Sequence, residues 1–176
     1  MSGEVAFGLA ISDNCACHPG KARQHCSVIG AGRSDTGKIL VDLSPFYDHP
    51  RGVVKRMSGL YESHNPVDVA LDPKSQAATL KKPLAEAGII VRELSVEDVA
   101  VAHGEFLDLV DDNGLEHLGQ KPLTDAVRAG QQRRLAGALA WERKVPVDQS
   151  PLEAATVGVW AFLRWEEMSR PGVYAV

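Results

Sequence analysis

The sequence of 176 residues lacks the features that would place it outside the ordinary globular class. No apolar segment reaches the roughly 20 consecutive residues that a membrane-spanning helix needs. The N-terminus has no basic stretch followed by an apolar one, so no secretory signal is expected. Cys15, Cys17 and Cys26 are few and odd in number, which argues against a disulfide framework. We therefore expect an intracellular domain without a membrane partner.

The sequence also has no overall excess of positive charge. The net charge of −4 argues against a general electrostatic coat for nucleic acid. The length suits one domain covering residues 1–176, which can bury a substantial core. The first strand is expected to begin almost at once, at Val5, as in a domain taken from a longer protein.

Basic residues gather in one region, residues 121–144. The region contains Lys121, Arg128, Arg133, Arg134, Arg143 and Lys144 against Asp125 and Glu142. Two interpretations stay open: a surface that contacts phosphates, or a solvated face of mixed charge.

Two short motifs invite a ligand. The stretch CACHPGKARQHC combines the three cysteines with His18 and His25, ligand types that suit tetrahedral Zn²⁺. The spacing is not a familiar zinc pattern, and small buried thiols at two strand ends explain it as well.

The stretch GAGRSDTGKI nearly matches the phosphate loop G-x-x-x-x-G-K-[ST], with Gly32, Gly37 and Lys38 in register. That loop needs a hydroxyl after the lysine and a following helix. Ile39 and an alternating strand pattern follow instead, so residues 33–37 are predicted to form a hairpin turn.

Hydrophobic periodicity predicts an α/β domain with a mixed sheet. Strands are expected over 5–12, 25–32, 38–44, 67–72 and 89–94, with an extended piece around Leu118; residues 133–144 fit strand or loop. Helices are expected over 51–63, through Ala77, Leu80 and Leu84 to a stop at Gly88, from a Ser95–Asp98 capping box to about Val110, and over 123–130. A last helix has Ser150 as N-cap and Glu153 as capping-box acid. Three meandering strands followed by helices that alternate with parallel strands match the RNase H-like order.

An RNase H-like sheet brings acids together from distant positions. Asp72 ends the fourth strand, and Asp148 precedes the last helix, where the positive end of the helix dipole favours a carboxylate. The middle of the first strand has Ala10 where an acid is expected, with Asp13 at the end of that strand. Asp72 also fits a turn residue, Asp148 a helix cap, and Asp13 a hairpin residue.

At these residues the chain resembles the nuclease domain of the large terminase subunit of tailed bacteriophages. The similar segments are FGLAIS, VALDPKSQAATL, SVEDVAVAHGEFLDLV, HLGQKPLTDAV and AWERKVPVDQSPLEAATVGVW. The resemblance implies an RNase H-like endonuclease that cuts concatemeric double-stranded DNA with Mg²⁺ or Mn²⁺ in the cytoplasm of the bacterial host. It also implies a separate ATPase domain, a small terminase subunit and a capsid portal as partners.

Carried over residue by residue, the resemblance makes Asp72 and Asp148 the second and third catalytic acids and metal ligands. For the first ligand the residues leave two alternatives: Asp13 substitutes through a bend of the strand, or this ligand is absent. It places Lys74, Arg133, Arg134, Arg143 and Lys144 near DNA.

Ala10 departs from the family pattern, which has aspartate there. An engineered substitution and a natural loss or relocation of the ligand both explain it, and either implies weakened or absent cleavage. Three other functions stay open: a junction resolvase or transposase core, a non-catalytic DNA-binding packaging module, and a zinc-binding module.

Overall fold

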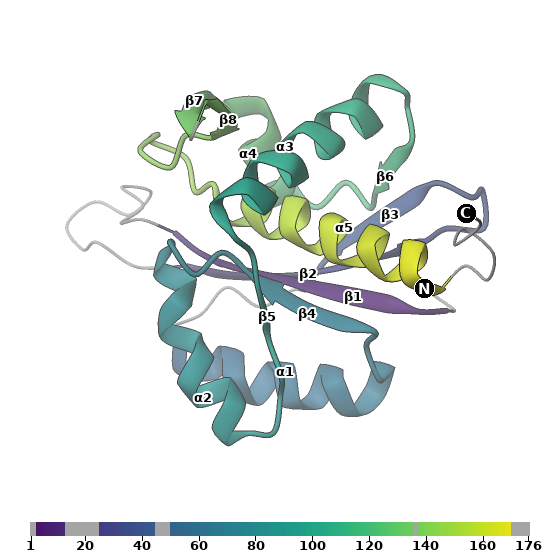
Figure 1. Cartoon of the computed structure of the whole chain (residues 1–176), viewed down its shortest axis with the longest axis vertical. Helices are drawn as coiled ribbons and strands as arrows, with labels where there is room; N and C mark the ends of the chain where they lie inside the picture. The colour runs from purple at the N-terminus through teal and green to yellow at the C-terminus, as the bar shows by residue number, and fades with distance from the viewer. Residues whose placement is uncertain (1–2, 13–24, 45–49, 136, 170–176) are drawn as a thin grey trace, which may run out of the picture.

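A mixed β-sheet forms the centre of the molecule, and helices cover both of its faces (Figure 1). We describe residues 3–12, 25–44, 50–135 and 137–169 of a computed structural model. The six strands are ordered β5-β4-β1-β2-β3-β6 across this sheet. This arrangement confirms the expected α/β class.

The strand directions follow the expected RNase H-like pattern. The first three strands are antiparallel neighbours, whereas β4 runs parallel to β1, β5 parallel to β4, and β6 parallel to β3. The strands of this sheet are β1 (Val5–Ile11), β2 (Cys26–Arg33), β3 (Ile39–Leu43), β4 (Asp68–Leu71), β5 (Arg92–Glu93) and β6 (Leu115–His117). Parallel pairing of β1 with β4 sends both chains out of the sheet at the same end, which positions the candidate site.

The turn between β2 and β3 is a hairpin and not a phosphate loop. The Ser34 N–H donates to the Lys38 carbonyl at 2.9 Å, and Gly37 has a φ of +83°, which glycine adopts without steric cost. A strand, not a helix, follows Lys38. The turn prediction is confirmed.

One face of the sheet is covered by the helical segments between β3 and β5 (Figure 1). These are α1 (Pro50–His64), the 3₁₀ helix η1 (Gln76–Leu80) and α2 (Lys81–Glu86). Alternate residues of β1, such as Phe7 and Leu9, pack with Met57 and Leu84 in this layer of the core. The periodicity therefore predicted both helical segments correctly, although the second is divided into a 3₁₀ and an α part.

The opposite face is covered by α5 (Ser150–Ser169), with α3 (Val96–Asp111) and α4 (Lys121–Ala129) packed beyond it (Figure 1). Gly8 allows α5 to approach the sheet closely, because a Cβ at that position would overlap the Ala154 carbonyl oxygen. From Leu152 to Phe162 nearly every residue of α5 is buried. The sequence predicted a helix with one buried face; α3 and α4 bury its other sides.

Two segments differ from their expected forms. Of the strand expected over 89–94, only Arg92 and Glu93 pair with β4, and Ile90 is 84% exposed. Residues 133–144, which fitted strand or loop, contain a separate hairpin of β7 (Gln132–Leu135) and β8 (Ala138–Trp141). This hairpin lies over α3 and leads into the connection to α5.

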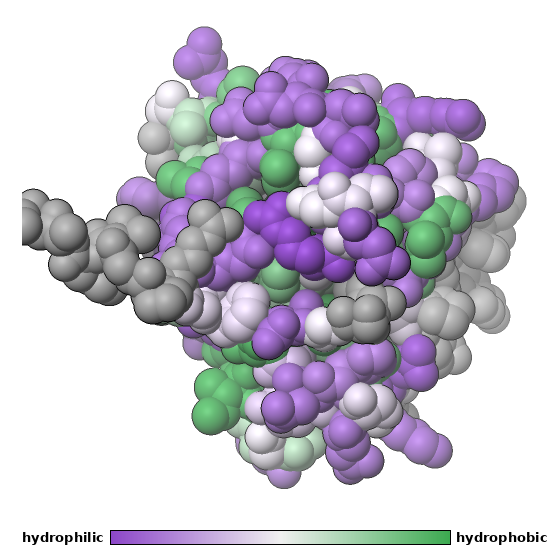
Figure 2. Space-filling model, turned by 90° about the vertical axis from the view of Figure 1, so that its right-hand side faces the viewer, coloured by the Kyte–Doolittle hydropathy of each residue, from purple (hydrophilic) through white to green (hydrophobic). Residues whose placement is uncertain are grey.

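The surface beside the β2–β3 turn and the end of α5 is mainly hydrophilic, with small separate hydrophobic groups (Figure 2). Within the described ranges, no helix is both long enough and apolar enough to cross a membrane.

Candidate functional site

The register of the sheet places Ala10 and Asp72 at the same end of neighbouring strands. Leu9 of β1 is paired with Leu71 of β4 in the parallel ladder. Ala10 follows Leu9, and Asp72 follows Leu71. Side chains alternate along a strand, and Ala70 belongs to the layer of the core under α5, so Asp72 is directed to the same layer. Ala10 belongs to this layer and is 3% exposed. The first and second expected acid positions therefore lie side by side.

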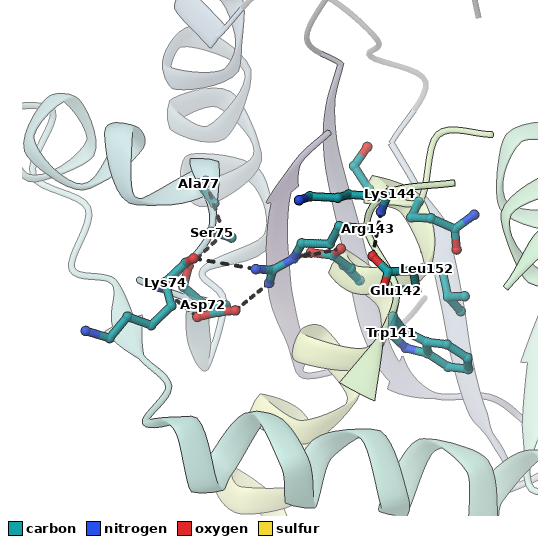
Figure 3. A network of polar contacts seen from close by, with 12 residues as sticks. Asp72, Lys74, Ser75, Ala77, Trp141, Glu142, Arg143, Lys144 and Leu152 are labelled. Carbon is teal, nitrogen blue, oxygen red and sulfur yellow. Dashed lines mark hydrogen bonds and ion pairs between the residues drawn. The ribbon is translucent and has the colours of Figure 1, made fainter. Parts of the chain in front are cut away.

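Asp72 forms a turn at the end of β4 and also presents a carboxylate oxygen to another segment. Its Oδ1 accepts the Lys74 N–H at 2.8 Å, and its carbonyl accepts the Ser75 hydroxyl at 2.7 Å. The other oxygen, Oδ2, lies 2.5 Å from Arg143 Nη2 (Figure 3). The turn interpretation of Asp72 is thus confirmed without removing its carboxylate from the site.

Arg143 bridges the buried carboxylate of Asp72 and the partly buried carboxylate of Glu153. Its Nε donates to Glu153 Oε1 and Oε2 at 3.0 and 3.1 Å, while Nη2 contacts Asp72. Burial lowers the pKa of Arg143, but the charges and hydrogen bonds of Glu153 and Asp72 raise it, and the net shift is upward. The guanidinium is therefore held in its charged form by the two acids that it contacts.

Glu153 is a site residue for which the sequence predicted another role. It was expected to close a capping box with Ser150, but its carboxylate contacts Arg143, and the Ser150 hydroxyl lies 2.8 Å from that of Ser27. The helix begins at Ser150 itself, and the Glu153 N–H donates to the Gln149 carbonyl at 3.0 Å, so Ser150 is not the N-cap that the sequence predicted. The sequence signal for this role was an acid in the first turn of the helix, on the side that also carries Thr156 and Val157; these three residues line one cavity, described below.

Asp148 lies just before α5 and has two partners. Its Oδ1 accepts the Ser150 N–H at 2.9 Å, which satisfies one backbone donor at the start of the helix. Its Oδ2 lies 3.0 Å from His25 Nδ1, and the His25 N–H donates to the Ser12 hydroxyl at 2.7 Å. Asp148 also lines a small cavity together with Arg143 and Glu153. Arg143, which lines this cavity, also contacts Asp72, so Asp148 and Asp72 lie at the same end of the sheet.

The other predicted positions separate into three groups. Lys74, Arg134 and Lys144 are exposed, whereas Arg133 is partly buried and donates from Nε to the Trp141 carbonyl at 3.1 Å. Arg143 contacts Glu153 and Asp72, the latter contact visible in Figure 3, and its side chain is only 16% exposed, whereas the neighbouring Lys144 is exposed.

Two predicted groups of ligands remain largely outside the described residues. Asp13 lies there, as do three members of the proposed zinc group, Cys15, Cys17 and His18. The other two members point to different surroundings: Cys26 belongs to the core under α1, and His25 contacts Asp148.

A small cavity adjoins the bridged acids between α3, β8 and α5. It has a volume of about 30 Å³ and includes Asp72, His103, Trp141 and Arg143 in its lining. The rings of His103 and Trp141 meet edge to face, with centroids 4.5 Å apart. Burial lowers the pKa of His103, so the neutral ring is favoured in the folded chain. The cavity has room for about one water molecule and not for a nucleobase.

The side-chain arrangement does not fit a two-ion centre. Hard divalent cations need oxygen ligands that converge on the ion. In the described ranges no group of three or more His, Cys, Asp or Glu side chains is arranged to hold a metal ion. The carboxylates of Asp72 and Glu153 already share a positive partner, the guanidinium of Arg143.

No protein-family model and no curated protein matches this sequence. Solved structures with a similar fold include the large terminase of the HK97 bacteriophage, with 13% identity and a TM-score of 0.68. The aligned region covers 92% of this chain and 40% of the HK97 chain. The large terminase nuclease of the thermophilic phage G20c has 16% identity and a TM-score of 0.65 and covers 90% of this chain and 83% of its own. A second structure of that nuclease, with bound magnesium, has a TM-score of 0.61.

A third similar protein is the nuclease domain of the large terminase subunit of the bacterial virus Sf6. Its K428A mutant, with manganese, has 15% identity and a TM-score of 0.52 and covers 97% of this chain and 90% of its own. This chain spans well under half of the HK97 protein but most of the two nuclease domains. At these identities the likeness is one of fold, and the chain has the RNase H-like fold of the large terminase nuclease domains.

Proposed function

We propose that this chain is the nuclease-type domain of a tailed-phage large terminase subunit, and that it acts on double-stranded DNA during packaging in the host cytoplasm. The observation that carries the proposal is the contact of Asp72 and Glu153 with Arg143 at the end of β4 and the start of α5, with Asp148 lining the cavity beside them. The resemblance to the terminase nuclease domains implies catalytic acids at that place. An upstream ATPase domain, a small terminase subunit and a capsid portal are the partners that this function requires.

Within this proposal, exposed cations next to the acids bind the DNA backbone. Lys74 lies on the turn that begins at Asp72, and Lys144 follows Arg143 (Figure 3). Arg134 is exposed on β7, and Arg133 lies beside it. Lysine and arginine side chains in such positions neutralise phosphates without reading bases, so binding is expected to be independent of sequence and sensitive to salt.

Cleavage by the present sequence is proposed to be weak or absent. A small apolar side chain, Ala10, is buried beside Asp72 where the proposed reaction needs a third carboxylate. The remaining acids, Asp72 and Asp148, are assigned as the acidic positions of the site, and Mg²⁺ or Mn²⁺ as the ions that a completed site would use. These ions are present in structures of two nucleases with the same fold.

The same two features, Ala10 and the bridged Arg143, favour one alternative: a packaging module that binds DNA and does not cut it. The alternative differs from the nuclease proposal in one measurable respect. Restoring the acid at position 10 activates a weakened nuclease but leaves a binding module inert.

The test is nicking of supercoiled plasmid by the wild type, Ala10→Asp and Ala10→Asn, each with Mg²⁺, Mn²⁺ or EDTA. Ala10→Asn is the matched control, because it adds a side chain of similar size without charge. The nuclease proposal expects nicking by Ala10→Asp with a divalent ion and its loss when Asp72→Asn is added. A folded Ala10→Asp protein that binds DNA but stays inert with both ions contradicts the nuclease and supports the binding module.

A further inference from the structure

Arg143 is held in place from several directions. The Trp141 indole N–H donates to the Thr156 hydroxyl on α5 at 2.8 Å, and the Trp141 carbonyl accepts from Arg133 Nε. The indole also meets the ring of Phe106 edge to face. Arg143 follows two residues after this anchored tryptophan, and its side chain is only 16% exposed. The guanidinium is thus positioned by the fold and not drawn in from solvent by a chance contact.

The guanidinium contacts the same carboxylate oxygens that a metal cation between the two acids would contact. Nη2 contacts Asp72 Oδ2, and Nε is nearly equidistant from the two oxygens of Glu153. The planar guanidinium is always charged and offers several donors, which suits it to two acids at once. The side chains of Asp72 and Glu153 are 9% and 11% exposed, so neither is well solvated without this partner.

A divalent ion cannot occupy this arrangement as it stands. Mg²⁺ requires ligand oxygens at about 2.0–2.1 Å in near-octahedral geometry. An ion that close to Asp72 Oδ2 would lie next to Arg143 Nη2, and two positive charges that meet at a few ångströms in a poorly solvated site repel strongly.

We propose that in the present sequence, with alanine at position 10, Arg143 is the resident counter-cation of Asp72 and Glu153, so that these two acids take up no Mg²⁺ or Mn²⁺ while the guanidinium is in place. Removing it converts the two carboxylates into a divalent-cation site. The site is then a pair of acids whose positive partner is a side chain of the same chain. This inference concerns cation binding alone and does not depend on whether the domain cuts DNA.

Mn²⁺ binding to the full chain tests the proposal, measured by the loss of the free-ion signal in electron paramagnetic resonance. Arg143→Gln is compared with Arg128→Gln, which removes an exposed arginine on α4 by the same substitution. Arg143→Gln is expected to bind Mn²⁺ at least about tenfold more tightly than the wild type, and to lose this gain when Asp72→Asn is added. Arg128→Gln is expected to behave as the wild type. Equal binding by folded Arg143→Gln and wild type overturns the proposal.

A second measurement needs only the wild type, in case Arg143→Gln does not fold. Paramagnetic Mn²⁺ broadens the amide signals of residues near its binding site in nitrogen-15 spectra. The expected result is no selective broadening around Asp72 and Glu153 in the wild type. Selective broadening there overturns the proposal whatever the variants do. Failure of Ala10→Asp to nick DNA would contradict the proposed function and leave this result unchanged.

Discussion

Arg143 Nη2 lies 2.5 Å from Asp72 Oδ2, although 71 positions separate the two residues in the chain. Asp72 ends a strand that is parallel to β1, and Arg143 precedes the helix that crosses the same sheet. This contact joins the end of β4 to the segment before α5, the two places where the second and third acids are expected. Substitutions of Arg143 and its neighbours therefore test whether these residues stabilise the fold or serve the site.

Replacing Arg143 by glutamine is expected to lower stability by about 3–5 kcal/mol, because two poorly solvated carboxylates lose their positive partner. Urea unfolding at neutral pH measures the change. Arg128→Gln, on the exposed side of α4, should stay within about 0.5 kcal/mol of the wild type. A loss for Arg143→Gln no larger than that of the control would contradict the ion network.

Gly8→Ala is expected to destabilise the domain by about 3 kcal/mol or more, since the added Cβ would overlap the backbone of α5. Gly59→Ala is the matched control. Gly59 is exposed within α1, and nothing lies within 4 Å of the position that an added Cβ would take, so this change should stabilise by roughly 0.5–1 kcal/mol. Thermal unfolding of the two variants should therefore move the midpoint in opposite directions.

Asp148→Ala is expected to cost about 1–2 kcal/mol, because the Ser150 N–H loses its acceptor at the start of α5 and His25 loses its carboxylate partner. Asp148→Asn keeps an oxygen for the Ser150 N–H and should recover part of the loss. Chemical denaturation of both variants measures this difference. Equal losses for the two substitutions would show that the helix-start hydrogen bond contributes little.

His103 is expected to make stability fall in mild acid. Burial lowers the pKa of this ring, so the unfolded chain binds the proton more readily than the folded chain. The contribution of the neutral ring is present above the unfolded pKa of about 6.5 and is lost as the pH falls below it toward the lower folded pKa.

His103→Phe keeps a ring against Trp141 and removes the titrating group. Denaturant midpoints at about pH 7.5 and 5.5 should therefore differ less in this variant than in the wild type. A larger acid dependence in the variant would contradict the prediction. The same cavity is lined by four other charged residues: Asp72, Arg133, Arg143 and Glu153. Their contribution to the pH dependence of stability is the same in both proteins when the variant keeps their contacts.

Arg134→Gln and Lys144→Gln are each expected to weaken binding to duplex DNA and to reduce the slope of log affinity against log salt concentration by about 1. The reason is the loss of one phosphate contact from the exposed basic positions. Fluorescence anisotropy over a range of salt concentrations measures the slope. Lys82→Gln, on α2 across the sheet, is the control and should leave the slope unchanged. An equal reduction of the salt slope by all three substitutions would contradict the proposed DNA-binding surface.

Sequence patterns alone predicted the order of the main strands and helices, apart from the β7–β8 hairpin, and the position of Asp72 at a strand end. Period-two alternation and capping residues are local signals, and they depend on neighbours within a few positions. The Ser95–Asp98 capping box is confirmed for this reason: both of its hydrogen bonds lie within one turn of α3.

Tertiary structure decided the rest of the site. In the sequence Arg143 stands among other basic residues and Glu153 among helix-start signals, and neither local context reveals their contact. Which side chains meet depends on how closely α5 lies on the sheet at Gly8 and on where the β8 hairpin ends. Charges separated by many residues acquire a strong preference for one another only after packing has removed water from around them.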